Sequence, residues 1–345
     1  MSTNSNHPDM PLYAPTSHSL IDLATLAQIA RQAFGLYPSA PLHLIQSGLN
    51  DHYALPTAQG DFILRVYRHG WRSNADVVWE IELVNHLAQA GAPVAAAVPC
   101  SDGRWFTQIQ AVEGARQVAV FERAPAPYTH FGASGRHRIS PASCAEAFGR
   151  SVAQVHAAAD TYSPTATRFL LDLGHLLDRP LTAIAQVFTD RQRDVELLNQ
   201  LANQLREMLE PHLSAADWGA CHGDMSGGNS TYWQNRVIHF DFDCAGPGWR
   251  AYDLGVFFWS LSINGHGDDV WAPFLQGYRT QRALDTAELA LVPAFAAIRV
   301  IWLMGLWCAN ANRFGHHTLH LDYFERELER FRTLHDKAMR TRAGV

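Results

Sequence analysis

Lysine is almost absent from this chain of 345 residues. Lys and Arg together number 27, and only one of them, Lys337, is a lysine. A phosphate-binding P-loop requires a Gly-Lys-Ser/Thr triplet, and a Schiff-base enzyme requires a lysine in its active site. Lys337 stands in a charged segment near the C-terminus, so the sequence argues against both classes. Any phosphate clamp in this protein must therefore use arginine, backbone groups or a metal ion.

Paired cysteines and an excess of positive charge are also missing. The five cysteines are odd in number and never form a C-x-x-C pair, which is typical of free thiols in a reducing compartment. Because the chain also does not begin with a basic-then-apolar signal pattern, we expect a cytoplasmic protein. The formal net charge of −6 argues against nucleic acid as the main partner.

Long apolar runs are limited to one, at residues 289–309. Pro293 interrupts this run and Arg299 lies near its centre, where a charge would be costly in lipid. The run therefore predicts a buried helix, and we expect no membrane partner.

The remaining composition, 47% hydrophobic and 17% charged, is that of a folded protein with two lobes or domains. Residues 1–16 are polar and proline-rich, which predicts a disordered tail. Residues 17–123 carry helical spacing at 20–34, several short β-like runs and a helical segment at 77–89. Residues 124–340 are mostly helical, with predicted helices at about 142–159, 187–212, 251–263, 269–281, 285–311 and 319–340. The pattern predicts an α+β chain with a small β-rich N-terminal lobe and a larger helical C-terminal lobe.

The candidate for chemistry is the polar stretch from residue 221 to residue 243. Asp224 and Asn229 lie in a loop with three glycines, which can fold around one centre. A hairpin turning at residues 234–235 would return Asp241 to this loop, with Asp243 on the same face of the strand. Carboxylate and amide oxygens suit Mg²⁺ bridging phosphates better than Zn²⁺. A carboxylate left free of metal can orient or deprotonate a substrate hydroxyl.

These residues carry a family resemblance. His-Gly-Asp-x-x-x-x-Asn at 222–229, Phe-Asp-Phe-Asp at 240–243 and Tyr-Asp-Leu at 252–254 resemble the motifs of the aminoglycoside phosphotransferase and homoserine kinase-like (choline kinase-like) superfamily. The resemblance covers about residues 40–335 and implies a protein-kinase-like fold that uses ATP and Mg²⁺. A second His-Gly-Asp, at 266–268, has Pro273 in place of the asparagine and no Asp-x-Asp after it, so we interpret it as an ordinary loop.

The resemblance also implies roles for single residues. Asp224 would be the catalytic base, and His222 would support the catalytic loop beside it. Asn229 and Asp241 would be metal ligands. Asp243 would either bind the metal or support the residues that do, and Asp253 would brace the loop.

The N-terminal lobe is where the resemblance implies nucleotide binding. Arg65 occupies the strand position where kinases hold a lysine, and its forked donors suit phosphate oxygens. Glu80 and Glu82 could both pair with it. Glu80 shares the apolar face of its helix, so we predict the Arg65–Glu80 pair. The further cofactor-binding candidates are Gly48 and Asn50, in a loop over the phosphates, and the main chain of Glu122 and Ala124 at the hinge between the lobes.

The acceptor site should lie beside Asp224, but the sequence leaves its chemistry open. Polycationic sugars need an acidic pocket, homoserine needs an arginine for its carboxylate, and choline-type amines need aromatic faces. The candidates are Arg250, Arg299 and Asp268. Arg299 either faces this pocket or forms a salt bridge within the protein.

We therefore predict an ATP- and Mg²⁺-dependent kinase for a hydroxyl of a small metabolite, homoserine- or amino-alcohol-like first and an aminoglycoside second. Three alternatives are weaker. A protein kinase would need an activation segment, and Asp253 follows Asp243 by only ten positions. A non-catalytic nucleotide-binding protein would not need Asp224. A metal hydrolase using His222, His239 and the neighbouring aspartates lacks a second histidine cluster. The nucleotide preference between ATP and GTP and the oligomeric state stay open.

Overall fold

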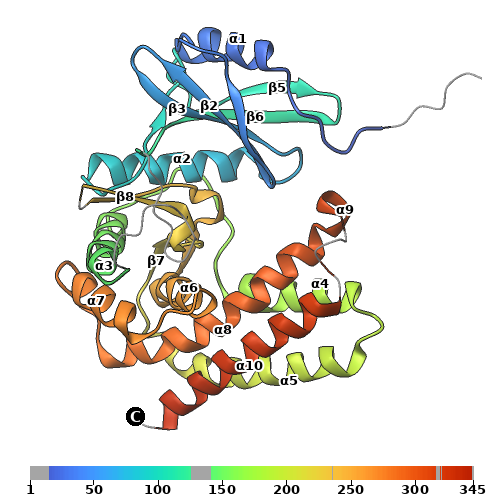
Figure 1. Cartoon of the computed structure of the whole chain (residues 1–345), viewed down its shortest axis with the longest axis vertical. Coiled ribbons are helices and arrows are strands. Elements are labelled where there is room, and N and C mark those ends of the chain that lie inside the picture. The colour runs from blue at the N-terminus through green and yellow to red at the C-terminus, as the bar shows by residue number, and fades with distance from the viewer. Residues whose placement is uncertain (1–14, 126–140, 235, 316–318, 320, 344–345) are drawn as a thin grey trace, which may run out of the picture.

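Two lobes make up the chain, a β-rich lobe and a helical lobe (Figure 1). The structure is a computed structural model that describes residues 15–125, 141–234, 236–315, 319 and 321–343. The predicted disordered tail lies outside the described residues except for positions 15 and 16. The last strand of the β-rich lobe ends at Glu122, directly before the predicted boundary between residues 123 and 124.

The N-terminal lobe is one antiparallel sheet covered by two helices. The strands run in the order β1-β2-β3-β6-β4, and β5 pairs with β6. The bounds are Leu23–Phe34 (α1), His43–Ser47 (β1), Asn50–Thr57 (β2), Gly60–Tyr67 (β3), Asn74–Gln89 (α2), Ala97–Val98 (β4), Thr107–Ala111 (β5) and Gly114–Glu122 (β6).

Alternation along β3 divides its side chains between the two faces of the sheet. Leu64 and Val66 belong to the buried cluster that contains the apolar face of α1. Tyr67 belongs to a second cluster, which contains Val77 of α2. Arg65 shares the α2 side of the sheet with Tyr67, and this is the side that meets the helical lobe.

Helix α2 begins at Asn74, three residues before the predicted start. The cause is a capping box: Ser73 Oγ accepts from the N–H of Asp76 at 3.1 Å, and the Asp76 carboxylate accepts from the N–H of Ser73 at 3.0 Å. These bonds satisfy two backbone donors that would otherwise be lost at the helix end. They also fix the direction in which α2 leaves the sheet.

The C-terminal lobe is mostly helical, with two short strand pairs. Its bounds are Pro141–Ala159 (α3), Arg179–Val187 (α4), Gln192–Leu213 (α5), Trp218–Cys221 (β7), Ser230–Trp233 (β8), Arg236–His239 (β9), Gly246–Trp249 (β10), Arg250–Ile263 (α6), Asp268–Arg279 (α7), Thr286–Ala309 (α8), Ala311–Phe314 (α9) and Leu321–Ala343 (α10). The β8–β9 pair is the predicted hairpin, with Trp233 opposite Arg236.

The sequence prediction was wrong in two places in this lobe. The helix predicted at 187–212 begins five residues later, at Gln192, because the chain turns at residues 188–191, where the N–H of Arg191 bonds to the carbonyl of Phe188, and the preceding helix α4 was not predicted. The pair β7–β10 was missed, because its glycine-rich strands carry no local β signal and exist by pairing with each other.

Helix α8 is the central helix of this lobe. Among the described residues it is the one helix long and apolar enough to cross a membrane, and 78% of its most apolar window is buried in the protein. It packs against α4, α6 and α10, which accounts for its all-round apolar surface. The predicted buried helix is therefore found, with Arg299 inside it.

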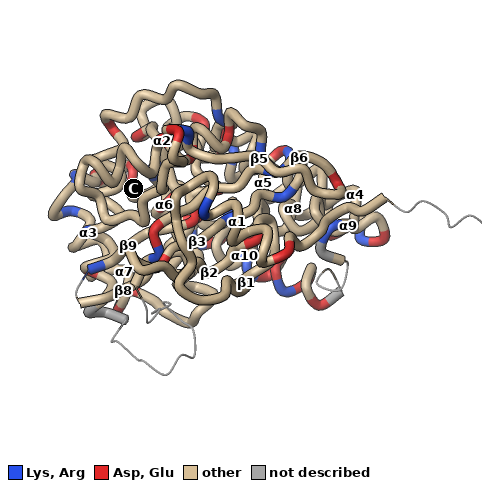
Figure 2. Tube along the Cα trace, turned by 90° about the horizontal axis from the view of Figure 1, so that it is seen from above, with Lys and Arg blue, Asp and Glu red and all other residues tan. Residues whose placement is uncertain are grey.

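Charge is mixed over the chain. Lys and Arg positions are interspersed with Asp and Glu positions along the trace (Figure 2). All five cysteines are free.

Candidate active site

Asp253, in the first turn of α6, holds the loop that follows β7. Its carboxylate accepts from the N–H of His222 at 2.7 Å and of Gly223 at 2.8 Å, and from Nε2 of His156 at 3.1 Å. Burial would raise the pKa of Asp253, but these hydrogen bonds outweigh it and lower that pKa below its usual value. The contacts are those of the bracing role expected for Asp253.

Gly223 allows the loop to turn toward the cleft. Its φ is 76°, and a Cβ on it would lie 2.1 Å from the carbonyl oxygen of Cys244. Since no other residue type fits both constraints, the middle position of the His-Gly-Asp motif has a steric explanation.

His222 supports the loop with both ring nitrogens. The N–H of Asp224 donates to Nδ1 at 3.2 Å, and Nε2 lies 3.0 Å from the carbonyl oxygen of Phe240. Because Nδ1 accepts, Nε2 must be the protonated nitrogen that donates to Phe240. Both nitrogens of the ring are therefore used to hold the loop against the end of the β8–β9 hairpin. This geometry favours a supporting role for His222 over that of a base.

Asp224 is paired with Arg299 of α8. Nη2 of Arg299 donates to Oδ1 of Asp224, and Nη1 donates to the carbonyl of Gly223 at 3.3 Å. The Asp224 side chain remains 26% exposed, while that of Arg299 is buried. Arg299 thus forms a salt bridge within the protein, which was one of the two alternatives, and its partner is the candidate base.

Asn229 and Asp241 converge beside Asp224. Nδ2 of Asn229 donates to the carbonyl of Asp224 at 3.0 Å, and the N–H of Phe240 donates to the carbonyl of Asn229 at 3.0 Å. Asp241 follows with φ 64°, a left-handed conformation that is uncommon outside glycine. Strained backbone of this kind concentrates at functional sites, so the outlier supports a functional role for Asp241.

Arg65 links the two lobes at this point. Its Nη1 lies 2.6 Å from Oε1 of Glu80, and its Nη2 lies 2.9 Å from Oδ1 of Asp241. Burial alone would lower the pKa of Arg65, but Glu80 and Asp241 outweigh it and raise that pKa above its usual value. The predicted Arg65–Glu80 pair is confirmed. Glu82 instead bonds to Thr165 on the outer side of α2.

The carboxylate of Asp243 is held by side chains of the N-terminal lobe, and its expected role at or beside a metal stays a prediction. Its Oδ2 accepts from Nε1 of Trp71 at 2.8 Å and its Oδ1 accepts from Nε of Arg72 at 3.0 Å. Nη2 of Arg168 also donates to its backbone carbonyl. Burial would raise the pKa of Asp243, but Arg72 and Arg65 outweigh it and lower that pKa strongly. Both carboxylate oxygens are thus taken by donors from the β3–α2 connection, and Asp243 fastens one lobe to the other.

A cavity of about 440 Å³ lies between the lobes. Its described lining includes five of the predicted site residues, Arg65, Glu122, Ala124, Asn229 and Asp241, together with apolar side chains from both lobes, among them Ile45, Ile63, Val84, Phe121 and Phe242.

Gly48 and Asn50 are not part of that lining. They form the β1–β2 turn, in which the N–H of Gly48 donates to the carbonyl of Asn50 at 3.1 Å and Nε of Arg68 donates to the carbonyl of Gly48 at 3.0 Å. The cavity is lined instead by residues deeper in the two strands, such as His52. A role of this turn over phosphates stays a prediction.

Two of the acceptor candidates lie elsewhere. Arg250 is buried in a network of its own, with Nη1 bonded to the carbonyl of His156 at 2.6 Å and Nη2 to Asp160 at 2.8 Å. Asp268 is exposed in the first turn of α7 and is not among the residues that line the cavity. Arg250 is therefore a structural residue and Asp268 a surface residue, and Arg299 is the acceptor candidate that reaches Asp224.

A model of the phosphotransferase enzyme family (APH) matches residues 42–291 of the chain. The chain belongs to this family. Among its relatives, an uncharacterized protein of Deinococcus radiodurans is 38% identical over 316 residues, which cover 90% of this chain and 89% of the relative. A homoserine kinase of Granulibacter bethesdensis is 27% identical over 263 residues, which cover 72% and 75% of the two chains.

Solved structures give the same fold for this phosphotransferase. The amicoumacin kinase hAmiN, in complex with AMP-PNP, Ca²⁺ and Ami, has a TM-score of 0.70 at 21% identity, over 92% of this chain and 94% of the other. The microcompartment-associated aminopropanol kinase also has a TM-score of 0.70 at 21% identity, over 93% and 98%. The predicted protein-kinase-like fold is thus confirmed, and so is a small-molecule kinase with a hydroxyl acceptor.

Sequence reasoning about this phosphotransferase missed the residues that hold the site from outside the motifs. Trp71, Arg72 and Arg168 surround Asp243, and His52 accepts from Nε of Arg65 at 3.1 Å. Burial and the Arg65 charge lower the pKa of His52 to about 4, so it stays neutral beside the guanidinium. A tryptophan and an arginine directly before a helix cap were the available signal, but their partner is more than 170 positions away.

Proposed function

We propose that the protein is an ATP- and Mg²⁺-dependent kinase that phosphorylates a hydroxyl group of a small metabolite, with a homoserine- or amino-alcohol-like acceptor favoured. One observation carries this proposal. Asp224, Asn229 and Asp241, which are separated along the chain, converge beside a cavity that also contains the hinge and Arg65. A base, metal ligands and a phosphate-binding arginine are the parts that phosphoryl transfer requires.

The cavity suits a nucleotide. Its apolar side chains can enclose a flat base, and the hinge offers backbone groups at one end. The N–H of Glu122 already donates to the carbonyl of Ala96 at 2.8 Å. We therefore expect the carbonyl of Glu122 and the backbone of Ala124 to bind the adenine. The nucleotide analogue bound by the amicoumacin kinase supports this role for the cleft.

Asn229 and Asp241 fit a hard divalent cation. The amide nitrogen of Asn229 is held by Asp224, which leaves its oxygen as the ligand atom, and Asp241 uses only Oδ1 to bind Arg65. Mg²⁺ is usually held by one or two such oxygens together with substrate phosphates, and bound there it would neutralise charge on the transferred phosphoryl group. Arg65 would add a fixed positive charge from the N-terminal lobe.

Asp224 would orient the acceptor. Arg299 holds its Oδ1, so the second oxygen is the one available to a hydroxyl group. Kinases of this kind gain rate mostly from positioning and charge neutralisation, because little covalent chemistry is left to the protein. The anchored loop and the two-point contact of Arg299 provide that positioning.

The same pairing argues against a polycationic acceptor. An aminoglycoside site needs uncompensated acidic groups, whereas the charge of Asp224 is balanced by a buried arginine. Asp268, the acidic candidate from the sequence, lies away from the cavity lining. The homoserine- or amino-alcohol-like acceptor is therefore favoured.

Observations argue against two of the alternative functions, the protein kinase and the metal hydrolase. Residues 244–252, between Asp243 and Asp253, are used by β10 and the start of α6, which leaves no length for an activation segment. His239 is buried, with its two ring nitrogens 2.7 and 2.8 Å from Ser230 and Ser151 hydroxyls, so it is not free to bind a hydrolytic metal.

The test is an ADP-release assay with a panel of amino alcohols, hydroxy amino acids, choline, sugars and aminoglycosides. We expect acceptor-dependent release by the wild type and none by Asp224→Ala. Asp190→Ala, at an exposed position between α4 and α5, is the matched control and should keep wild-type activity. Equal release by wild type and Asp224→Ala would overturn the proposal.

A further inference from the structure

Arg299 is a buried cation inside the most apolar helix of the protein, and it reaches the candidate base. We propose that Arg299 determines acceptor specificity by binding a carboxylate of the acceptor while it holds Asp224. This inference rests on the proposed kinase function and narrows its acceptor to hydroxy acids, with homoserine as the simplest case.

The guanidinium is held in place from three sides. It contacts Asp224 Oδ1 and the carbonyl of Gly223, and its Cζ lies 4.5 Å from the ring centroid of Trp302 and 5.3 Å from that of Trp259. The residue is 2% exposed. A buried arginine keeps its charge, so the site contains a permanent cation directly beside the candidate base.

The two tryptophan faces are the aromatic surfaces that a substrate ammonium group would need. Both are occupied by the cation of Arg299 itself. A choline-type amine would have to displace this guanidinium from both rings, and it would meet like charge as it approached. The arrangement therefore disfavours an acceptor whose cationic group lies next to its hydroxyl.

Donors outnumber acceptors around Arg299. The hydroxyl of Tyr252 also lies beside the guanidinium. Nε of Arg299 and Nε1 of Trp259 are nevertheless buried donors without a hydrogen-bond partner in the part of the chain that the structure describes. Buried donors of this kind are rarely left unpaired, so their presence points to a ligand that supplies acceptor oxygens. Arginine offers five N–H donors in a planar fork, of which Asp224 and Gly223 take two.

A carboxylate is the group that fits these observations. It supplies acceptor oxygens for the free donors and it matches the fork geometry of the guanidinium. A hydroxy acid could then place its carboxylate on Arg299 and its hydroxyl on the second oxygen of Asp224. Arg299 would thus set the distance between the two groups in the preferred acceptor.

The experiment compares hydroxy amino acids with the same molecules lacking the carboxylate. The pairs are homoserine and 3-amino-1-propanol, threonine and 1-amino-2-propanol, and serine and ethanolamine. For the pair that is turned over, we expect kcat/KM to favour the carboxylate member. In Arg299→Gln this preference should fall by about 10- to 100-fold, as for one lost hydrogen-bonded charge contact. A merely structural role would lower both members equally.

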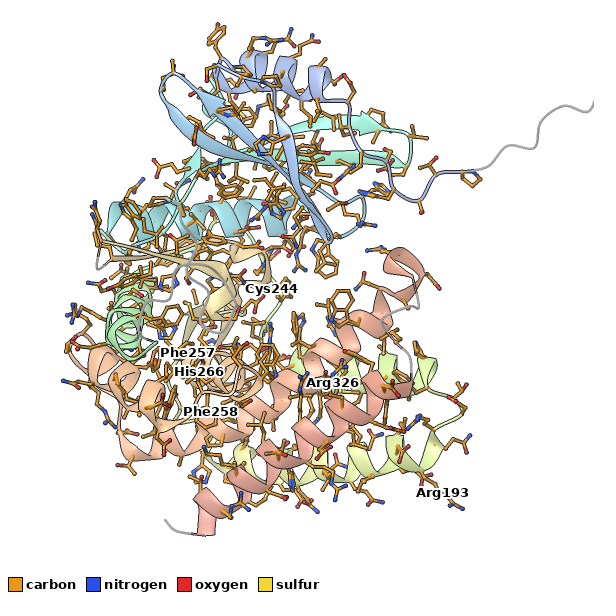
Figure 3. All side chains as sticks on the ribbon, in the orientation of Figure 1. Arg193, Cys244, Phe257, Phe258, His266 and Arg326 are labelled. Atoms are coloured by element: carbon orange, nitrogen blue, oxygen red, sulfur yellow. The ribbon has the colours of Figure 1, made fainter. Side chains whose placement is uncertain are left out.

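Two controls keep the test interpretable. Calorimetric titration with Mg²⁺·ATP shows whether Arg299→Gln is folded. If it is not, Arg299→Lys replaces it, and we expect part of the carboxylate preference to return because the charge is kept. Arg326→Gln, at a half-exposed position on α10, should keep the wild-type preference (Figure 3).

Two results would overturn the inference in distinguishable ways. Turnover of ethanolamine, choline or an aminoglycoside in preference to every hydroxy acid would leave a kinase but remove the role of Arg299. An equal loss for both members of a pair in Arg299→Gln would do the same. Failure of the whole acceptor panel would overturn the proposed function itself.

Discussion

Four aspartates lie within 30 residues of one another, and they form two contrasting pairs. Asp243 and Asp253 are buried, and their carboxylates accept hydrogen bonds from Trp71 and Arg72 or from His156 and the backbone of the catalytic loop. Asp224 and Asp241 are partly exposed, at 26% and 35% of their side chains, and each has one arginine partner. The two pairs lie in the same stretch of sequence, but the residues that surround them in the folded protein are different.

The contrast shows that burial determines the role of a carboxylate, even among aspartates that are chemically identical. A buried carboxylate with every oxygen occupied stabilises the fold and has no capacity left for a ligand. A partly exposed carboxylate held by one arginine keeps an oxygen for substrate or metal. We therefore assign chemistry to Asp224 and Asp241, and architecture to Asp243 and Asp253.

The largest expected effect is on turnover in Asp224→Ala. Removing the carboxylate of the candidate base should lower kcat by about 1,000-fold or more. A loss of this size is typical when proton transfer and substrate orientation are removed together. Binding of Mg²⁺·ATP should change by less than about threefold, because Asp224 does not line the nucleotide cavity. Steady-state kinetics and calorimetry measure the two quantities. Turnover like that of the wild type would place Asp224 among the structural aspartates.

The next effect is on stability in Asp253→Asn. The amide cannot accept from both backbone N–H groups of the loop and from His156, so buried donors lose their partner. We expect the free energy of unfolding to fall by about 3 kcal/mol. Urea denaturation of both proteins measures the difference. An unchanged midpoint would remove Asp253 from the architectural pair.

Asp241→Ala should act on the metal. Without this carboxylate, the Mg²⁺-dependent part of nucleotide affinity should fall by about 100-fold, while binding without Mg²⁺ changes little. Titration of ATP with and without Mg²⁺ separates the two. If Mg²⁺ strengthened binding to the variant as much as to the wild type, the assignment of Asp241 would fail.

Asp243→Asn sharpens the contrast within the Asp-x-Asp motif. The amide keeps the shape but removes the charge that Arg72 faces, and we expect a loss of stability of about 2 kcal/mol. The Mg²⁺ dependence of nucleotide binding should stay within about twofold of the wild type. A loss of Mg²⁺ dependence as large as that in Asp241→Ala would return Asp243 to the metal site.

The smallest effect is on the pH dependence of stability. Burial lowers the pKa of His239, which lies between Ser151 and Ser230, to about 3, whereas in the unfolded chain it stays near the usual 6.5. As pH falls below 6.5 the unfolded state takes up the proton first, so stability is lost. At pH 5.5 this histidine should contribute a loss of about 1.4 kcal/mol relative to pH 7.5. In His239→Gln, the difference between the free energies of unfolding at pH 7.5 and pH 5.5 should be smaller than in the wild type by about 1.4 kcal/mol. Urea unfolding curves at the two pH values measure it.

Much of the site could be predicted because its residues lie in short local patterns. The spacing of Asp224, Asn229 and Asp241 defined the loop and hairpin. The apolar face of the following helix selected Glu80 over Glu82 as partner of Arg65, and the 2.6 Å contact agrees. Charge in an apolar helix marked Arg299 as a residue in need of a partner.

The rest depended on contacts that no local pattern contains. Alternation along a strand put Asp243 beside Asp241, but the chain leaves the strand after His239 and turns at Asp241, which sends the two carboxylates to different surroundings. Arg250 was a candidate for binding the acceptor because it is an arginine near the motif. In the structure it pairs with Asp160, which lies 90 positions away in the chain. Long-range pairing of this kind decides burial, and burial decides the role.

The most direct test of the account is the mass of the acceptor after incubation with Mg²⁺·ATP and each of two variants, Asp224→Asn and Asp243→Asn. The account predicts that the wild type and Asp243→Asn convert the acceptor to a product heavier by one phosphoryl group, and that Asp224→Asn leaves it unmodified. An unmodified acceptor with the wild type while ATP is consumed, or the same product with Asp224→Asn, would contradict it.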